Sequence, residues 1–135
     1  MIFFLALLFT IYCIIMSLRT LFIPNVIKGK RISLENFLYL AFTYVTVLVG
    51  FGLIYILLEI NGYPVMVEDT VYIDESFFER LKTSLYFSAV TLFSVGYGDI
   101  APVGFGRGIA VVEALIGYTL PAAFVAKAMF DKEKS

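Results

Sequence analysis

Histidine is absent from this sequence of 135 residues, and cysteine occurs once, at Cys13. Without histidine the chain lacks the commonest general base and most zinc sites. A single cysteine forms no disulfide within the chain, so it does not indicate the redox compartment. Charge is also scarce, because 16% of the residues are charged, against about 25% in average soluble domains. The net charge of −1 argues against a nucleic acid partner.

Apolar residues are abundant instead and make up 61% of the chain. Three long apolar segments run from Ile2 to Ile23, from Asn36 to Leu58 and from about Phe105 to Phe130. Each is long enough to cross a bilayer, which takes about 20 residues. A fourth apolar segment, Thr83 to Gly98, is short for a crossing and suits a re-entrant segment that is buried in protein. The sequence therefore predicts an all-α membrane protein with three transmembrane helices and one re-entrant helix.

The first apolar segment has two alternative interpretations, a cleaved signal peptide and an interfacial helix. No basic residue precedes Leu18, and no small-x-small cleavage site follows the apolar run. The segment also lacks the charged face of an interfacial helix. We therefore interpret it as a membrane span.

Loop charges predict the orientation in the membrane. The loop between the first two spans contains mainly basic residues: Arg19, Lys28, Lys30 and Arg31. The loop after the second span contains mainly acidic residues: Glu68, Asp69, Asp74, Glu75 and Glu79. By the positive-inside rule the N-terminus lies outside, the C-terminal tail lies in the cytoplasm, and the re-entrant segment enters from outside. The run Lys28–Arg31 is interpreted as this orientation signal, with lipid head-group binding as a second role.

The most informative motif follows the re-entrant segment and reads Ser94-Val95-Gly96-Tyr97-Gly98-Asp99. Gly96 and Gly98 can adopt positive φ at little cost. When such residues alternate with Val95 and Tyr97, successive carbonyl groups can point to one side of the chain. Several copies around one axis would then stack rings of carbonyl oxygens.

This motif closely resembles the signature sequence of potassium channels. The order of segments from Asn36 to Phe130 also resembles a prokaryotic channel with two helices and a pore loop, here with one extra N-terminal helix. The resemblance implies a homotetrameric pore in the cell membrane that conducts K⁺ passively. It divides the chain into an N-terminal helix (1–23), a cytoplasmic linker (24–35), a pore domain (36–130) and a cytoplasmic tail (131–135). The pore domain comprises an outer helix (36–60), an extracellular loop (61–80), a pore helix (81–93), a filter (94–99) and an inner helix (105–130).

The resemblance also assigns roles within the filter. K⁺ would be coordinated by the hydroxyl group of Ser94 and by the backbone carbonyls of Ser94, Val95, Gly96 and Tyr97. The ring of Tyr97 would brace the filter against pore-helix aromatics such as Tyr86 and Phe87. Gly98 would support the filter backbone. Asp99 would lie at the outer mouth, attract cations there and accept a hydrogen bond from Tyr86.

Two positions depart from the family pattern. Ser94 replaces the usual threonine, so the hydroxyl group remains but the methyl group is lost, and we expect a looser innermost site. Val90 stands where some members have glutamate, so a carboxyl pair with Asp99 is not available.

The inner helix contains Gly117, at the position of the family's hinge, and Pro121 one turn later. Both residues weaken a helix, which predicts gating by bending at this point. The alternative is that small residues here only permit close helix packing. Ala122 and Ala126 would line the inner pore.

Glu113 is an acidic residue inside a predicted span, where an ionisable group is by default paired or functional. We expect it either to bond pore-helix hydroxyl groups such as those of Ser88 or Thr91, or to stay protonated. In both cases it would brace the filter from behind.

Other functions remain as alternatives: a non-selective cation channel, a pore-loop subunit of a potassium uptake system, or a non-conducting subunit. An enzyme is disfavoured because the sequence shows no nucleophile–base pair or metal cluster. No span contains the spaced arginines of a voltage sensor. Relatives often carry a cytoplasmic ligand-sensing domain, which here would be absent or would be a partner outside this chain.

Overall fold

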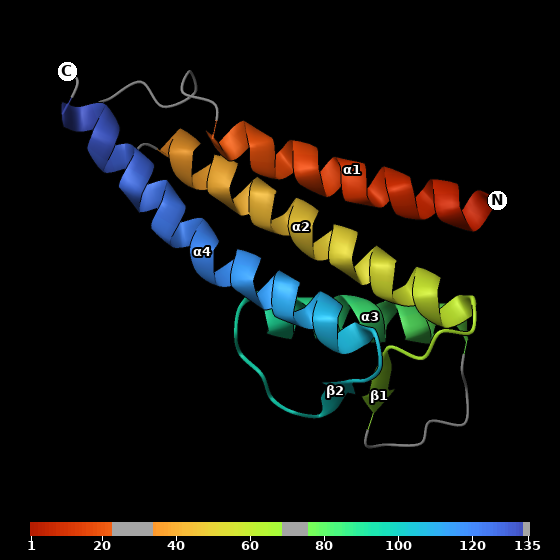
Figure 1. Ribbon diagram of the computed structural model, residues 1–135. Coiled ribbons are helices and arrows are strands. Elements are labelled where there is room, and N and C mark those ends of the chain that lie inside the picture. Colours follow the sequence, from red (N-terminus) through yellow and green to blue (C-terminus); the bar gives the residue numbers. More distant parts are fainter. Residues whose placement is uncertain (23–33, 69–75, 134–135) are drawn as a thin grey trace.

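The computed structural model describes residues 1–22, 34–68 and 76–133. The described elements follow in the order α1 (Ile2–Phe22), α2 (Leu34–Ile60), β1 (Met66–Glu68), α3 (Phe77–Leu92), β2 (Ile100–Pro102) and α4 (Gly106–Glu133). In Figure 1, α1, α2 and α4 run alongside one another, and α3 lies near one end of this bundle. The linker up to residue 33 and residues 69–75 of the acidic loop lie outside the described residues.

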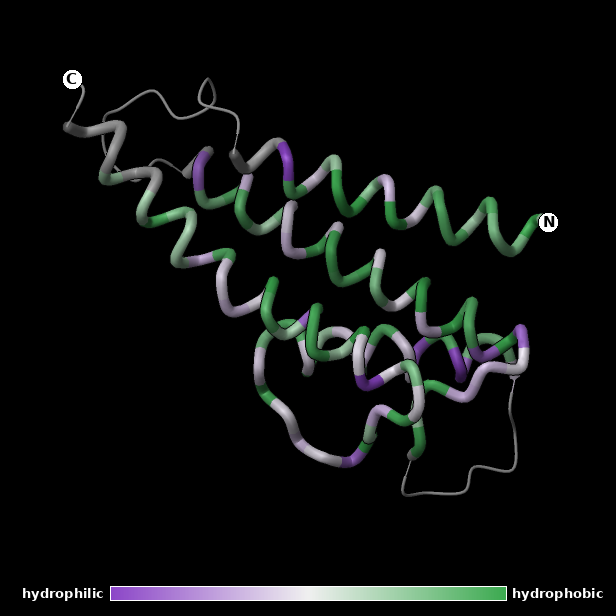
Figure 2. The backbone as a smooth tube through the Cα atoms, viewed as in Figure 1, coloured by the Kyte–Doolittle hydropathy of each residue, from purple (hydrophilic) through white to green (hydrophobic). Residues whose placement is uncertain are grey.

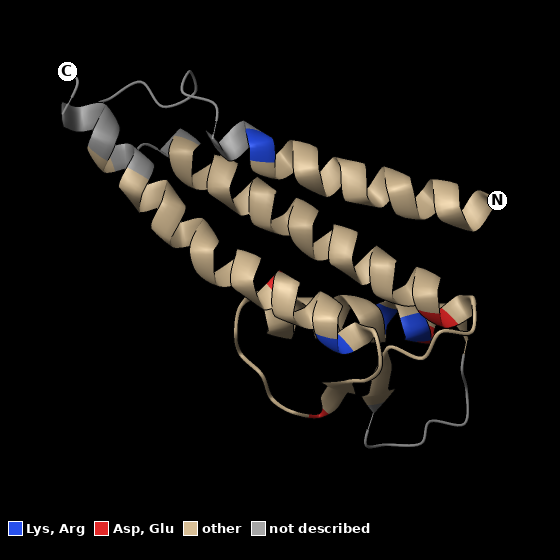
Figure 3. Cartoon of the chain, in the orientation of Figure 1, with Lys and Arg blue, Asp and Glu red and all other residues tan. Residues whose placement is uncertain are grey.

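The three long helices have the length and composition of membrane spans, at Ile2–Arg19, Asn36–Ile60 and Gly106–Ala126. Figure 2 shows that hydrophobic residues predominate along these helices. In Figure 3, the charged residues of the described part lie mostly near helix ends and around α3, where no lipid-spanning segment has to bury them. The predicted membrane protein of mainly helical fold with three transmembrane helices is confirmed.

α2 packs between α1 and α3, and two glycines allow the close approach. A Cβ atom at Gly50 would lie 2.6 Å from the side chain of Ile14 on α1. A Cβ atom at Gly52 would lie 2.6 Å from the side chain of Leu85 on α3. The side chains of Val47 and Tyr55 on α2 are fully buried. The core of the described part is therefore centred on α2.

The re-entrant helix begins earlier than the sequence indicated, at Phe77 instead of residue 81. Ser76 is its N-cap, because the side-chain oxygen accepts a hydrogen bond from the backbone N–H of Glu79 at 3.4 Å. Glu79 stands in the first turn, where a carboxylate is favoured by the helix dipole, and pairs with Lys82 at 2.6 Å. These charges suggested a loop in the sequence, whereas they stabilise a helix end.

A short antiparallel sheet is the feature that the sequence did not predict. β1 pairs with β2 in the register Met66 with Pro102 and Glu68 with Ile100. The N–H of Val103 extends the contact by donating to the carbonyl of Val65 at 2.9 Å. The sheet thus ties the chain that follows α2 to the chain that follows the filter motif, directly before α4.

Candidate functional site

The loop after α3 begins with three residues whose backbone N–H groups donate hydrogen bonds to carbonyls of α3. The N–H of Ser94 donates to the carbonyl of Thr91 at 3.0 Å, and the N–H of Val95 donates to that of Val90 at 2.9 Å. The N–H of Gly96 also reaches the Val90 carbonyl, at 3.2 Å. The last turn of α3 therefore anchors the first half of the motif through its donors and leaves the carbonyl groups of these residues outside the helix.

Backbone handedness alternates along the motif. Ser94, Gly96 and Gly98 have φ values of 55°, 57° and 81°, whereas Val95 and Tyr97 between them do not have positive φ. Alternate left-handed and right-handed residues turn successive peptide groups so that their carbonyls can face the same side. Within this chain a Cβ atom at either glycine would meet nothing within 4 Å. The glycines are therefore required for their conformation and not for space.

Ser94 adopts the same left-handed conformation although it carries a side chain. This conformation costs a non-glycine residue about 1–2 kcal/mol. Such strain is found where surrounding structure and function maintain it. A glycine would avoid the cost at this position, so the serine side chain is retained against a conformational penalty.

Side chains of the motif are exposed in the single chain. The exposed fraction is 73% for Tyr97 and 49% for Val95. Phe93, which directly precedes the motif, is 53% exposed. Within this chain the motif therefore leaves its apolar side chains uncovered.

Asp99 ends the motif beside two tyrosines. Its carboxylate accepts a hydrogen bond from the Tyr86 hydroxyl, and this bond raises the pKa of Tyr86, with burial and the negative charge of Asp99 contributing in the same direction. Tyr97 also lies close enough to Tyr86 to affect it electrostatically. Three of the residues assigned from the sequence are thus neighbours at the end of the filter motif.

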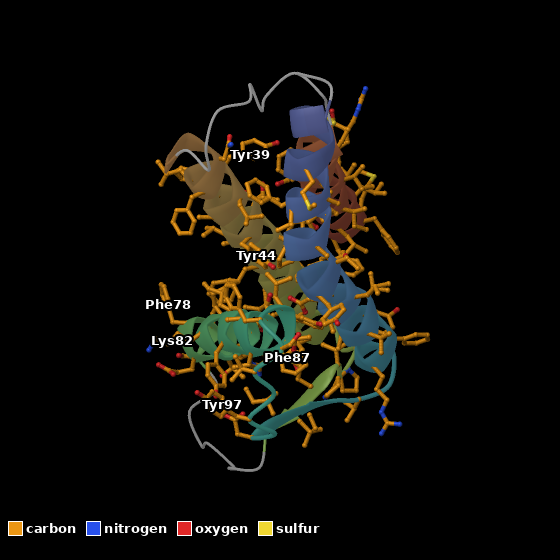
Figure 4. The ribbon with its side chains drawn as sticks, turned by 90° about the vertical axis from the view of Figure 1, so that its left-hand side faces the viewer. Tyr39, Tyr44, Phe78, Lys82, Phe87 and Tyr97 are labelled. Atoms are coloured by element: carbon orange, nitrogen blue, oxygen red, sulfur yellow. The ribbon has the colours of Figure 1, made fainter. Side chains whose placement is uncertain are left out.

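Phe87 has a different role from the one expected for a filter brace. Its ring is buried and packs edge-on against Tyr55 of α2, with ring centroids 5.0 Å apart. Figure 4 shows Phe87 on α3 and Tyr97 on the loop beyond it. Phe87 therefore attaches the pore helix to the outer helix.

Glu113 is fully buried at the meeting point of α2, α3 and α4. The Tyr55 hydroxyl donates to its Oε2 at 2.8 Å, and Ser88 hydrogen bonds with its Oε1. Ser88 Oγ also lies 2.9 Å from the Leu48 carbonyl oxygen. The Ser88 partner was expected from the sequence and Tyr55 was not, while Thr91 instead uses its carbonyl to hold Ser94. The carboxyl group thus joins all three helices behind the filter motif.

The number of protons in this cluster bears on the charge of Glu113. A serine hydroxyl has one proton to donate, and a backbone carbonyl can only accept. When Ser88 donates to Leu48, the Oε1 atom of Glu113 must carry the proton of its bond with Ser88. Glu113 thus bonds a pore-helix hydroxyl group, the first of the two expectations for this residue, and a proton on its carboxyl group, the second expectation, would let Ser88 donate to Leu48.

Gly117 of α4 packs against the end of α3. A Cβ atom here would overlap the carbonyl group of Leu92. Close packing, the alternative to a hinge, is therefore present at Gly117. Pro121 lies inside α4, and the Thr119 hydroxyl bonds the carbonyl of Leu115 at 2.8 Å, a contact that often bends helices.

Ala122 and Ala126, the expected pore-lining residues, are exposed on α4. Their side chains are single methyl groups, so they take up little space on this face of the helix. Exposure of these two alanines is compatible with a position beside a pore.

Comparison with known proteins agrees with this geometry. A family model described as an ion channel matches residues 43–129. The chain therefore belongs to this family of pore-loop ion channels, a family of membrane transport.

Among named relatives, the chain is 41% identical to protein LctB of Bacillus caldotenax, over 85% of this chain and 86% of the relative. It is also 41% identical to protein LctB of Geobacillus stearothermophilus, over 87% of this chain and 88% of the relative. The name LctB states no activity. No solved structure matches the chain.

Proposed function

We propose that this protein is a potassium-selective channel that conducts K⁺ passively through a filter of backbone carbonyls. The observation that carries the proposal is the alternating handedness of residues 94–98, with φ of 55° at Ser94, 57° at Gly96 and 81° at Gly98. This conformation allows successive carbonyls to face one side, the arrangement that a dehydrated K⁺ would require of its ligands. Ser94, Val95, Gly96 and Tyr97 would supply the ligands, and Asp99 would concentrate cations at the outer mouth.

The proposed assembly is a homotetramer, because K⁺ filters of this kind are built from four loops around one axis. The uncovered side chains of Val95 and Tyr97 support this, since neighbouring copies would bury them. The bilayer is the second partner.

The proposed orientation places the N-terminus outside and the C-terminus in the cytoplasm. In Figure 1 the N-terminus and α3 lie towards one end of the long helices, and the C-terminus lies at the other. The described basic residue of the first loop, Arg19, belongs to the last turn of α1, at the end that this orientation assigns to the cytoplasm.

Gating is proposed to occur by bending of α4 between Gly117 and Pro121. Pro121 removes one backbone hydrogen bond from the helix, and the Thr119 side chain weakens the adjacent turn. Bending there would move Ala122 and Ala126, which follow the bend, relative to the pore axis.

Ion flux into liposomes tests the proposal directly. Purified protein is expected to carry K⁺ and not Na⁺, and to be blocked by Ba²⁺. A reversal potential near zero in mixed K⁺ and Na⁺ would instead identify a non-selective cation channel. Flux from a protein that cross-links only as a monomer would favour a subunit of an uptake system, and absence of any flux would refute a channel.

A glycine substitution links the flux to the filter. Gly98→Ala forces a side chain into φ of 81°, so we expect loss of K⁺ selectivity or of assembly. Gly62→Ala is a closely matched control, since Gly62 has φ of 82° in the loop after α2 and also has open space around it. Unchanged selectivity in Gly98→Ala would overturn the filter assignment.

A further inference from the structure

The carbonyl group of Gly117 has lost its normal partner in α4. In an α-helix the carbonyl of one residue accepts the N–H of the residue four positions later, here residue 121. Residue 121 is proline, which has no N–H and whose ring also crowds that carbonyl. The Gly117 carbonyl therefore needs a donor from elsewhere, because no water is present in the bilayer core to supply one.

The donor comes from the outer helix. The Tyr44 hydroxyl of α2 donates to the Gly117 carbonyl oxygen at 2.9 Å. Figure 4 shows Tyr44 on α2 pointing towards α4. A side chain far away in the sequence thus replaces the one backbone hydrogen bond that Pro121 removes.

The same tyrosine contacts the start of the filter. Its ring stacks on Phe93, with centroids 5.4 Å apart and planes 22° apart. Phe93 is the C-cap of α3 and directly precedes Ser94. Since Gly117 packs on the Leu92 carbonyl, Tyr44 and Gly117 both contact the end of the pore helix.

We propose that Tyr44 is a positioning residue for gating, which holds the weakened turn of α4 against the base of the filter. Its hydroxyl supplies the hydrogen bond that Pro121 removes, and its ring holds Phe93. Bending of α4 at Gly117 would break or strain this hydrogen bond, so the gate and the filter base move together. The inference rests on the proposed channel function, but the hydrogen bond on which it is built does not.

A double-mutant cycle between Tyr44 and Pro121 tests it. Tyr44→Phe removes only the hydroxyl group and keeps the stacked ring. Pro121→Ala restores the backbone N–H, so the Gly117 carbonyl regains a donor within α4. We expect Tyr44→Phe to change the open probability in bilayers by about two- to tenfold when residue 121 is proline. In the Pro121→Ala background the same change is expected to have almost no effect.

The controls separate this role from packing. Tyr12→Phe, at an exposed position of α1, is expected to leave gating unchanged. Equal effects of Tyr44→Phe in both backgrounds, or no effect in either, would overturn the proposal. Pro121→Leu also restores the N–H and replaces the alanine variant if that one does not assemble.

The cycle also has a readout that does not need conduction. In the proline background Tyr44→Phe is expected to lower the unfolding stability in detergent, and in the alanine background it is expected not to. If the variants show this coupling in stability but the wild-type protein carries no K⁺, the proposed function is refuted and the role of the Tyr44 hydrogen bond in holding α4 is kept. If the protein conducts K⁺ but the variants show no coupling, only the proposed role of Tyr44 is refuted.

Discussion

At about pH 5, replacement of Glu113 by glutamine is expected to leave the protein almost as stable as the wild type. The glutamine amide can donate to Ser88 and its oxygen can accept from Tyr55, as a protonated glutamate does. Because Glu113 is fully buried, either residue has to be satisfied by these partners. We expect a difference of less than about 1 kcal/mol in the free energy of unfolding at about pH 5, close to the ordinary glutamate pKa of about 4.3.

Replacement by leucine has a much larger expected cost. The Tyr55 hydroxyl then loses its acceptor in a buried site, at a cost of about 1–3 kcal/mol. Ser88 retains the Leu48 carbonyl as a partner, so only its bond to the carboxyl group is lost. Together these changes predict a loss of about 2–4 kcal/mol for Glu113→Leu.

Reversible unfolding in detergent, followed between about pH 5 and pH 8, measures both variants. In the unfolded chain glutamate has its ordinary pKa of about 4.3 and gives up its proton over this range. A neutral carboxyl group in the folded protein therefore predicts that the wild type loses stability relative to Glu113→Gln as the pH rises, by up to about 1.4 kcal/mol per pH unit. Glu79→Gln serves as the control, because Glu79 forms an exposed ion pair with Lys82, and such pairs contribute about 0–1 kcal/mol. A gap that stays constant with pH, or a glutamine variant as unstable as the leucine one at about pH 5, would contradict a neutral carboxyl group at Glu113.

Three further predictions follow from backbone and hydrogen-bond geometry. Ser94→Gly relieves the left-handed strain, so we expect a gain of about 1 kcal/mol in unfolding stability together with a reversal potential shifted towards zero. Gly117→Ala is expected to lower the free energy of unfolding by about 1–3 kcal/mol, because the added Cβ overlaps the Leu92 carbonyl group. Gly108→Ala, which has open space around it, is expected to leave the free energy of unfolding unchanged. The raised pKa of Tyr86 means that its hydroxyl still donates to Asp99 at a pH where an ordinary tyrosine, with a pKa of about 10, has begun to ionise. Its tyrosinate absorbance, measured as the difference from Tyr86→Phe, is therefore expected at higher pH than that of an ordinary tyrosine.

The sequence predicted the features that individual residue types encode. Long apolar runs set the three spans, and the alternation of glycines anticipated the positive φ values at Gly96 and Gly98. The left-handed backbone of Ser94 was not anticipated, because a serine gives no sign of it. The start of α3 was misplaced because the charged residues after Ser76 resemble a loop until the N-cap is recognised.

Contacts between distant segments were mostly beyond sequence reasoning. The strands Met66–Glu68 and Ile100–Pro102 are each three residues long, too short to show an alternating pattern. Tyr44 and Tyr55 are two of nine tyrosines in the chain. Nothing local distinguishes them from the tyrosines that face lipid, because their roles depend on which carbonyl or carboxyl group another helix brings to them.

The outer helix nevertheless contains a pattern that accounts for these contacts. Tyr44, Leu48, Gly52 and Tyr55 follow one another at intervals of three or four residues, so they share one face of α2. On that face, both tyrosine hydroxyls form hydrogen bonds with α4. Gly52 packs against α3, and the Leu48 carbonyl lies within hydrogen-bond distance of Ser88 on α3. Gly50, which packs against α1, lies on a different face. α2 contributes no residue to the filter motif, yet the face with Tyr44 and Tyr55 contacts both α3 and α4, the helices before and after the motif. Changes on this face are therefore expected to affect conduction more than changes on the face towards α1.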